Sequence, residues 1–346
     1  MYHLRERLAV AVYRTGLAHV ILKASVGLPS SWQRLTVMTW HRIAKDLGCG
    51  FDRGVISASP EQFDQQVAVL KEYCSLIDTT DIERYRDEGR PLPPNPALLT
   101  FDDGYRDNLT VAVPILKKHH AKAVFFIPTG FMGVRRLFWW ERISAIVARC
   151  RRSEIRLRYP APLQFSLSDG VSRYQAERRL ARVGKTHPRM DLSLFLTGLA
   201  EACEVPWDEN MERSLADELI LDWSGVRTLV EDGMNVQSHG DSHRILPTIP
   251  AEEVLSDLRT CRELLQAQTG LEQRVLAYPA GLGFAPGDPG YRAVEQAGFG
   301  LAFLLDGATC RMARISDWLN ISRLWSTPGM TDERFRGYLA APNYLA

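Results

Sequence analysis

The chain has 346 residues, 45% of them hydrophobic and 24% charged, which suits one large globular domain or two modest ones. A formal net charge of +1 gives no field that would attract nucleic acid, so we predict no nucleic-acid partner. The six scattered cysteines form no close pair, and no apolar run reaches the roughly 18–20 residues of a membrane-spanning helix, so we predict a cytoplasmic protein with reduced thiols.

The N-terminal residues 1–32 are predicted to form an amphipathic helical segment. Charged residues interrupt its apolar run, so it lacks the clean apolar core of a signal peptide. At helical spacing, an apolar stripe is made up of Val10, Tyr13, Leu17 and Ile21. Two interpretations are open. Residues 5–24 lie on an anionic membrane, with the protein peripheral on its inner face, or they dock on the protein's own core. Leu4, Leu8 and Val12 spoil the segregation of the stripe and favour docking.

After residue 32, short apolar runs typical of buried strands alternate with helical patterns. The predicted strands are 35–40, 97–101, 123–127, 234–238, 275–278, 300–305 and 320–324. The predicted helices are 61–73, 108–119, 222–232, 251–268 and 289–297. This alternation implies parallel strands joined by right-handed crossovers. Seven such units predict that residues 33–346 form an α/β barrel, in which the chemistry sits where strands end.

The segment at about 133–221 breaks this alternation, because about ninety residues there show no strong strand pattern, far more than an ordinary connection. It is rich in arginine and begins near Trp139 and Trp140. We predict a basic, mostly helical insertion that covers the substrate and holds a phosphate or lipid headgroup. The alternative is a solvated helical surface without a binding role.

Polar residues gather where the predicted strands end. They are His41, Asp102, Asp103, His239, His243, Tyr278, Pro279, Ala280 and, within the last strand, Arg323. Because the strand ends of a parallel barrel share one rim, residues distant in sequence converge there. Each motif alone has an ordinary explanation, such as a turn for Asp-Asp-Gly or a solvated helical turn for the histidine pair. Their occurrence at successive strand ends favours a site.

The chemistry of these residues fits a metal centre. His239 and His243 are four residues apart, which brings them to one side of a helical turn. Two imidazoles and a carboxylate make a facial ligand set for a divalent cation. That cation would also keep the second aspartate ionised despite burial. Since adjacent strand residues point to opposite faces, Asp102 and Asp103 can serve one site only if the backbone turns near Gly104.

Four segments resemble motifs of the NodB-like polysaccharide deacetylases: TFDDG at 100–104, SHGDSH at 238–243, YPAG at 278–281 and MTWHRI at 38–43. The resemblance runs from about residue 35 to about 325, outside the insertion. It implies a distorted (β/α)7 barrel of the NodB-like type that hydrolyses N-acetyl groups on amino sugars with one divalent metal ion, usually zinc.

The resemblance also implies roles for single residues. Asp102 matches the catalytic base, and the metal ligands are matched by Asp103, His239 and His243. Ala280 takes the position whose backbone N–H holds the oxyanion. We further expect substrate contacts from Tyr278, Pro279, Arg323, Trp139 and Trp140. A cytoplasmic enzyme would meet nucleotide-linked or lipid-linked amino sugars rather than finished polymer.

The sequence departs from the family pattern twice. Ala277 stands where many members have an arginine that orients the base. The segment 321–323 replaces a Leu-x-His whose histidine protonates the leaving amine, and no histidine follows His243. We therefore predict His41 as the general acid, because the first and last strands of a closing barrel are neighbours. The alternative is a structural histidine bonded to backbone.

Two rival functions remain open from sequence alone. One is the hydrolysis of a non-sugar amide on the same fold. The other is a metal-free, non-catalytic glycan-binding protein, with the missing histidine as the sign of lost activity. Retention of all four residues that match the base and the metal ligands argues against the second.

Overall fold

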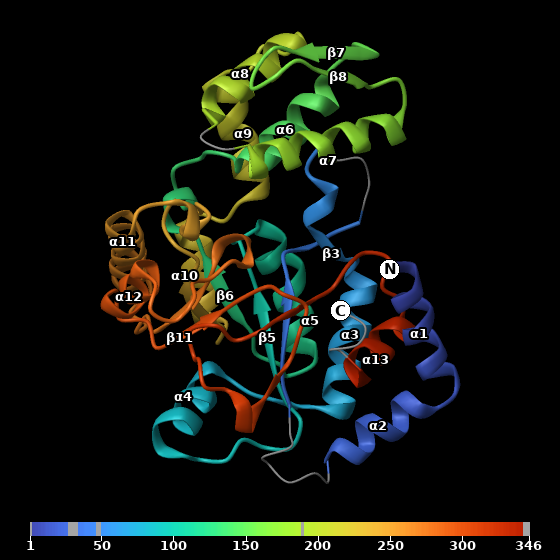
Figure 1. Ribbon diagram of the computed structural model, residues 1–346, viewed down its shortest axis with the longest axis vertical. Helices are drawn as coiled ribbons and strands as arrows, with labels where there is room; N and C mark the ends of the chain where they lie inside the picture. The colour runs from blue at the N-terminus through green and yellow to red at the C-terminus, as the bar shows by residue number, and fades with distance from the viewer. Residues whose placement is uncertain (1, 27–33, 46–49, 188–189, 342–346) are drawn as a thin grey trace. The chain divides into compact units, whose positions relative to one another are not determined.

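The computed structural model describes residues 2–26, 34–45, 50–187 and 190–341, and these fall into two compact units (Figure 1). The first unit takes in the described residues of Met1–Lys45, Ser57–Gly133 and Leu221–Ala346. The second takes in those of Asp46–Ile56 and Val134–Ile220.

A curled parallel sheet is the centre of the first unit. Its main strands are β1 (Arg34–Trp40), β5 (Pro96–Phe101), β6 (Val124–Ile127), β9 (Asn235–Ser238), β10 (Val275–Ala277) and β11 (Leu301–Phe303). They pair in parallel in the order β11-β10-β9-β6-β5-β1. Ile321 bridges Phe303 of β11, and the short strand β13 (Leu324–Trp325) pairs in parallel with β1. The segment 321–325 therefore closes the sheet, which confirms the prediction of a distorted (β/α) barrel.

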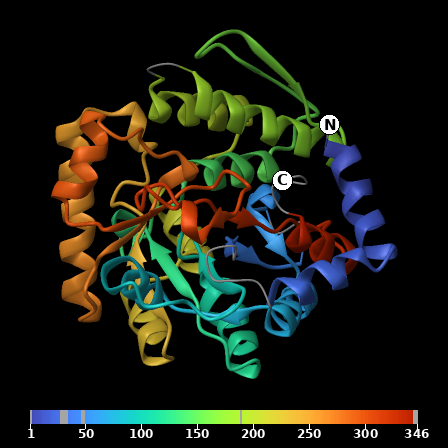
Figure 2. The same cartoon turned by 60° about the horizontal axis from the view of Figure 1, so that its bottom comes forward.

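Helices cover the outside of this sheet. They are α3 (Pro60–Tyr73), α4 (Thr79–Glu88), α5 (Val113–Lys118), α10 (Trp223–Glu231), α11 (Ala251–Thr269) and α12 (Pro289–Gln296). Helices α11 and α12 pack side by side, as Figure 2 shows in orange. The predicted start of α3 is confirmed by a capping box in which the Ser59 and Gln62 side chains each accept from the other's backbone N–H. The sequence did not indicate α4, nor two short strands: β4 (Ser75–Leu76), which pairs with β5, and β12 (Cys310–Arg311), which pairs with β1.

The strands of the barrel bury both of their faces. One face contributes to a core cluster that includes Val37, Phe126 and Ala277. The other face of β10 packs beneath α11 and α12, in a cluster that includes Leu276 and Tyr278. This alternation decides which side chains near the strand ends can reach a site inside the barrel.

The N-terminal helices α1 (Tyr2–Arg14) and α2 (Leu17–Val26) pack on α13 (Asp332–Ala340), as the blue and red helices of Figure 1 show. Ala18 is fully buried, and a Cβ on Gly337 would overlap the Ala9 backbone. His19 Nδ1 lies 2.8 Å from the Tyr73 hydroxyl on α3. These contacts support docking on the protein's own core.

Membrane contact by this segment stays a prediction. The structure does not describe the side chains of residues 2–7, which include Arg5 and Arg7, and it does not describe residues 27–32 at all. Within the described ranges, no helix combines the length and the apolar character needed to cross a bilayer.

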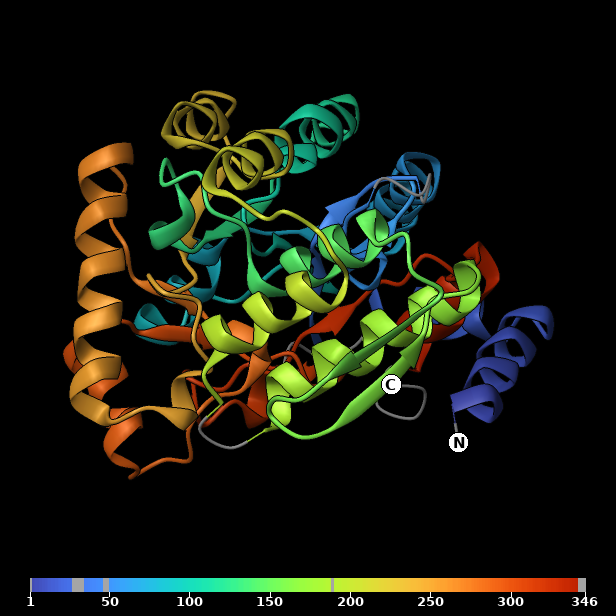
Figure 3. The same ribbon diagram turned by 90° about the horizontal axis from the view of Figure 1, so that it is seen from above.

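The described part of the second unit contains four α-helices, a hairpin and the short 3-10 turn Arg53–Val55. The helices are α6 (Trp139–Arg149), α7 (Gly170–Thr186), α8 (Leu192–Ala202) and α9 (Glu209–Leu219). The antiparallel strands β7 (Glu154–Leu157) and β8 (Leu163–Ser166) lie along α7 in Figure 3. The sequence analysis predicted no strand here, because each strand has only four residues, although both alternate between polar and apolar side chains. The described residues 50–56 also belong to this unit, and Asp52 N–H donates to the buried Glu141 carboxylate at 2.7 Å.

A matched pair of substitutions tests the docking of α2. Leu22 is 6% exposed, so Leu22→Ala should lower the free energy of unfolding by about 2–5 kcal/mol. Leu17 lies on the same helix but is 48% exposed, and Leu17→Ala should change it by less than about 0.5 kcal/mol. Urea denaturation measures both. If Leu22→Ala is as stable as Leu17→Ala, and Leu17→Ala alone weakens binding to anionic vesicles, the membrane interpretation replaces docking.

Candidate metal and catalytic site

Asp102 and Asp103 follow directly after β5, and the backbone turns there as the sequence required. Asp103 has φ 74° and Gly104 has φ 67°, both in the left-handed region. Aspartate tolerates this conformation better than most residues, because its short side chain bonds locally. A Cβ on Gly104 would lie 3.0 Å from Ile127 Cδ1, so a larger residue there would have to displace that side chain. Both carboxylates are 2% exposed, and the turn sends them to different partners.

Asp103 forms a compact group with the two histidines. Its Oδ1 lies 3.0 Å from His243 Nε2 and 3.3 Å from His239 Nε2. The ligand atoms of the three residues all lie within 4.8 Å of one another, and among the described residues they form the one such group of His, Cys, Asp or Glu. His239 Nδ1 lies 2.8 Å from the Ala277 carbonyl oxygen, so we assign the ring proton to Nδ1, which donates to that oxygen. This tautomer leaves Nε2 with a lone pair for a metal. Two imidazoles and one carboxylate suit zinc or a similar divalent ion.

The electrostatics of this group favour a cation. Burial alone would raise the pKa of Asp103, but hydrogen bonds with His239 and His243 hold it well below its usual range. Burial lowers the pKa of His243 below its ordinary value, although Asp103 opposes the shift. Burial also opposes charge on His239, but the carboxylates of Asp102 and Asp103 raise its pKa. The group therefore offers an ionised carboxylate.

The two histidines converge through a loop, so the prediction that they share a helical turn is wrong. Gly240 and His243 have φ of 73° and 54°, which a right-handed helix does not allow. Asp257 on α11 accepts hydrogen bonds from Asp241 N–H at 2.8 Å, from Ser242 N–H at 3.0 Å and from the Ser242 hydroxyl. Sequence reasoning missed this residue. Its signal was an acid on the apolar stripe of α11, which consists of Val254, Leu258, Cys261 and Leu265.

Arg323 binds both oxygens of the Asp102 carboxylate through its two terminal guanidinium nitrogens. Nη1 donates to Asp102 Oδ1 and Nη2 to Oδ2, each at 2.8 Å, while Nε donates to the Leu304 carbonyl at 2.8 Å. The guanidinium also lies over the Phe126 ring, 5.5 Å from its centroid. Burial alone would raise the pKa of Asp102, but Arg323, and then His239, lower it below its ordinary value. Because Arg323 is 0% exposed, the prediction that it binds substrate is wrong.

The structure brings His41 to the same site. Strands β1 and β5 run in register with Trp40 opposite Phe101, and Asp102 N–H donates to the Trp40 carbonyl at 3.0 Å. His41 directly follows Trp40 at the end of β1, just as Asp102 directly follows Phe101 at the end of β5. Its charge, when protonated, lowers the pKa of both Asp102 and Asp103. This proximity is the condition that a proton donor requires.

The YPAG segment contributes backbone rather than side chains. The Tyr278 ring is fully buried in the cluster beneath α12 and packs edge-on against Phe284, so the prediction that it contacts substrate is wrong. Pro279 is buried against the Gly240 turn, which does not favour substrate contact. Ala280 is exposed with φ 58°, a conformation that turns its backbone away from the preceding strand.

Both predicted tryptophans take part in packing within the second unit. Trp140 is 8% exposed and stacks on Phe138 with ring centroids 4.6 Å apart. Trp139 packs on the core cluster of this unit, and its ring lies against Gly184. This packing accounts for both side chains without a ligand. Their contact with substrate remains a prediction.

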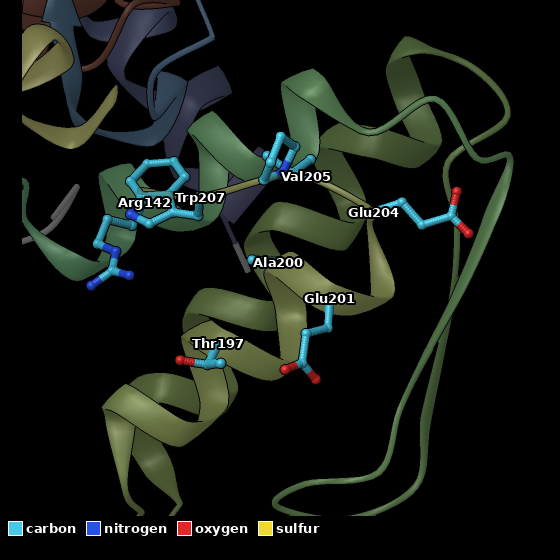
Figure 4. A pocket seen from close by; sticks show the side chains of 8 residues that line it. Arg142, Thr197, Ala200, Glu201, Glu204, Val205 and Trp207 are labelled. Atoms are coloured by element: carbon cyan, nitrogen blue, oxygen red, sulfur yellow. The ribbon is translucent and has the colours of Figure 1, made fainter. Parts of the chain in front are cut away.

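A cavity of about 620 Å³ lies within the second unit (Figure 4). Arg142 stacks over the Trp207 ring at 5.2 Å along one side, and Glu201 projects from α8. Its lining brings together no group of metal-ligating side chains among the described residues. The candidate site is therefore the Asp103, His239 and His243 group of the first unit.

Comparison with known proteins agrees with this geometry. The family model for polysaccharide deacetylases matches residues 89–155 and 189–296, about half of the chain. The chain belongs to the polysaccharide deacetylase family. The matched segments contain Asp102 and the Asp103, His239 and His243 group. They contain Ala277, one departure from the family pattern, but not His41, nor the other departure at 321–323.

Solved structures of deacetylases share the fold. The Streptococcus pyogenes deacetylase PplD, in complex with acetate, is 16% identical, with 87% of this chain and 96% of that chain covered and a TM-score of 0.55. IcaB from Ammonifex degensii is 19% identical over 89% of this chain and 97% of that chain, with a TM-score of 0.55. A polysaccharide deacetylase from Bacillus cereus is 17% identical, with 89% of this chain and 69% of that chain covered and a TM-score of 0.56. A search of curated proteins gave no match.

The contacts of Asp257 predict a role in metal affinity. Asp257→Ala frees the loop between the two histidines and should weaken zinc binding about 10–100-fold, the usual effect of losing an outer-shell partner. Glu263→Ala, at an exposed position of the same helix, is the matched control and should leave affinity unchanged. Competition with a zinc-chelating dye measures both. Equal affinity in the two variants would show that the loop holds its shape without Asp257.

Proposed function

We propose that this protein is a metal-dependent hydrolase that removes an N-acetyl group from an amino sugar in a glycan or glycan precursor. The observation that carries the proposal is the Asp103, His239 and His243 group beside a second ionised carboxylate, Asp102. Family membership supports deacetylation as the reaction class.

The ligand set fits a divalent ion, most simply zinc. It offers two imidazole nitrogens and an ionised carboxylate on one side, which leaves further coordination positions open. An ion bound there would polarise the acetyl carbonyl and make a water molecule more acidic. Contacts behind the ligands orient them. The Ala277 carbonyl bonds to the His239 ring, and the Asp257 carboxylate accepts from the loop between His239 and His243.

Asp102 is suited to act as the general base. Its carboxylate is ionised while buried, because Arg323 compensates the charge on both oxygens. The base takes a proton from water as the oxygen adds to the acetyl carbon. Ala280 lies at an exposed backbone turn and is proposed to present its N–H to the oxyanion.

His41 is proposed as the general acid. As the C–N bond breaks, the nitrogen needs a proton, because an amide anion is a poor leaving group. His41 follows the end of β1 as Asp102 follows the end of the neighbouring β5, and an imidazole can both donate and accept a proton. Acetate and the free amino sugar are then released. Arginine scarcely deprotonates, so Arg323 cannot take this role.

We propose a nucleotide-linked or lipid-linked amino sugar as substrate. A non-sugar amide remains the second enzymatic candidate, and a glycan-binding protein without activity the third. Assays of acetate release from acetylated amino sugars and from small cyclic amides separate the first two candidates. The third predicts neither a bound metal nor released acetate.

A first experiment tests metal and base together. Purified protein should hold a single divalent ion, and His243→Ala should lose it. Ion affinity should rise with pH through the raised pKa of His239, because its proton must leave before the ion binds. Asp102→Asn should keep the ion but lower deacetylation about 10²–10⁴-fold. Near wild-type turnover in Asp102→Asn would rule out its role as base.

A second experiment tests the acid. His41→Ala should lower amide turnover about 10²–10⁴-fold while leaving bound zinc unchanged. The loss on an acetyl ester should be much smaller, because an alkoxide departs more readily than an amine anion. Comparison of kcat on the two substrates measures the difference. Equal losses would assign His41 a structural or binding role instead.

A further inference from the structure

Both backbone polar groups of His41 are bonded to side chains. Its N–H donates to Ser57 Oγ on β3 (Ile56–Ala58) at 2.9 Å, and its carbonyl accepts from Asn108 Nδ2 at 2.6 Å. Ser57 is 4% exposed and Asn108 is 0% exposed. A residue within a sheet bonds instead to the backbone of its neighbours. His41 has thus left the ladder of β1 and is held by two buried side chains.

The residues after His41 are held by Asp107. Its Oδ2 accepts from Arg42 Nε at 2.9 Å, and its Oδ1 accepts from Ile43 N–H at 3.2 Å. Arg42 and Ile43 form the short strand β2, which pairs with β3. The third carboxylate of the segment that carries Asp102 and Asp103 is therefore not a metal ligand.

We propose that Ser57 and Asn108 are positioning residues for His41, fixing its backbone so that the imidazole lies at the site beside Asp102. This inference rests on the proposed function, in which His41 donates the proton. A displacement of about 1 Å in a reacting group can cost about 10²-fold in rate. A donor at the end of a strand has lost its ladder partners and needs other contacts to hold it.

The position of Asn108 links the acid to the base and the metal. Asn108 follows the Asp102–Asp103 pair by a few residues and begins the π-helical turn Asn108–Ala112, which continues into α5. Single π-turns of this kind occur often at functional sites. One stretch of chain therefore supplies the base, a metal ligand and a contact that orients the acid.

Substitution of Ser57 tests the inference. Ser57→Ala removes the acceptor for the His41 N–H, whereas Ser57→Thr keeps a hydroxyl there and is the conservative control. Amide kcat of Ser57→Ala should fall about 10–100-fold with KM little changed, and Ser57→Thr should retain most activity. Ester turnover should fall much less, and zinc affinity should match the wild type.

A double variant shows whether Ser57 acts through His41. In a His41→Ala background, Ser57→Ala should cause no further loss of amide turnover, because the group it orients is already gone. Asn108→Ala should give the same amide-selective loss and the same lack of additivity. Additive losses, or equal losses on amide and ester, would mean that these residues support the fold generally and would overturn the inference.

Failure of the proposed function has a different signature. If the wild type releases acetate and Ser57→Ala and Asn108→Ala match it, the positioning role alone is overturned. If the wild type binds zinc but releases acetate from no amide, the proposed function is overturned, and the role of His41 with it.

Discussion

Two adjacent carboxylates buried at the end of β5 are the constraint on which the rest of the site depends. Removing each charge from water costs several kcal/mol unless a partner compensates. The left-handed turn at Asp103 separates the pair, so that Arg323 compensates Asp102 while His239 and His243 face Asp103. The sequence led us to expect that a cation keeps Asp102 ionised. The structure gives that role to Arg323 independently of any ion.

Closure of the barrel and ionisation of Asp102 therefore depend on the same segment. Residues 321–325 join β11 to β1 and carry Arg323 into the interior. Loss of the guanidinium would leave an uncompensated buried charge, which typically costs about 3–5 kcal/mol. Arg323 scarcely deprotonates, so the proposed function takes its proton donor from elsewhere. His41, which directly follows β1, has that role in the proposal.

The sequence predicted the barrel and the convergence of Asp103, His239 and His243, but not the orientation of single side chains. Long apolar runs and capped helices follow local rules, so most strands and helices were found. Tyr278 was misplaced because a strand end does not reveal which face a residue takes. Ala277 faces the interior, so its neighbour faces outward. Asp257 and the loop of the two histidines depend on contact with a distant helix, which no local pattern contains.

The two departures from the family pattern fit each other physically. Ala277 lies in the same interior cluster as Phe126, and the Arg323 guanidinium lies over that ring. An arginine at 277 would bring a second cation into this interior, where Asp102 already accepts from Arg323 on both oxygens. A small residue at 277 is therefore compatible with an arginine at 323. The contact with His239 comes from the backbone carbonyl of residue 277, so an alanine side chain there does not disturb the Asp103, His239 and His243 group.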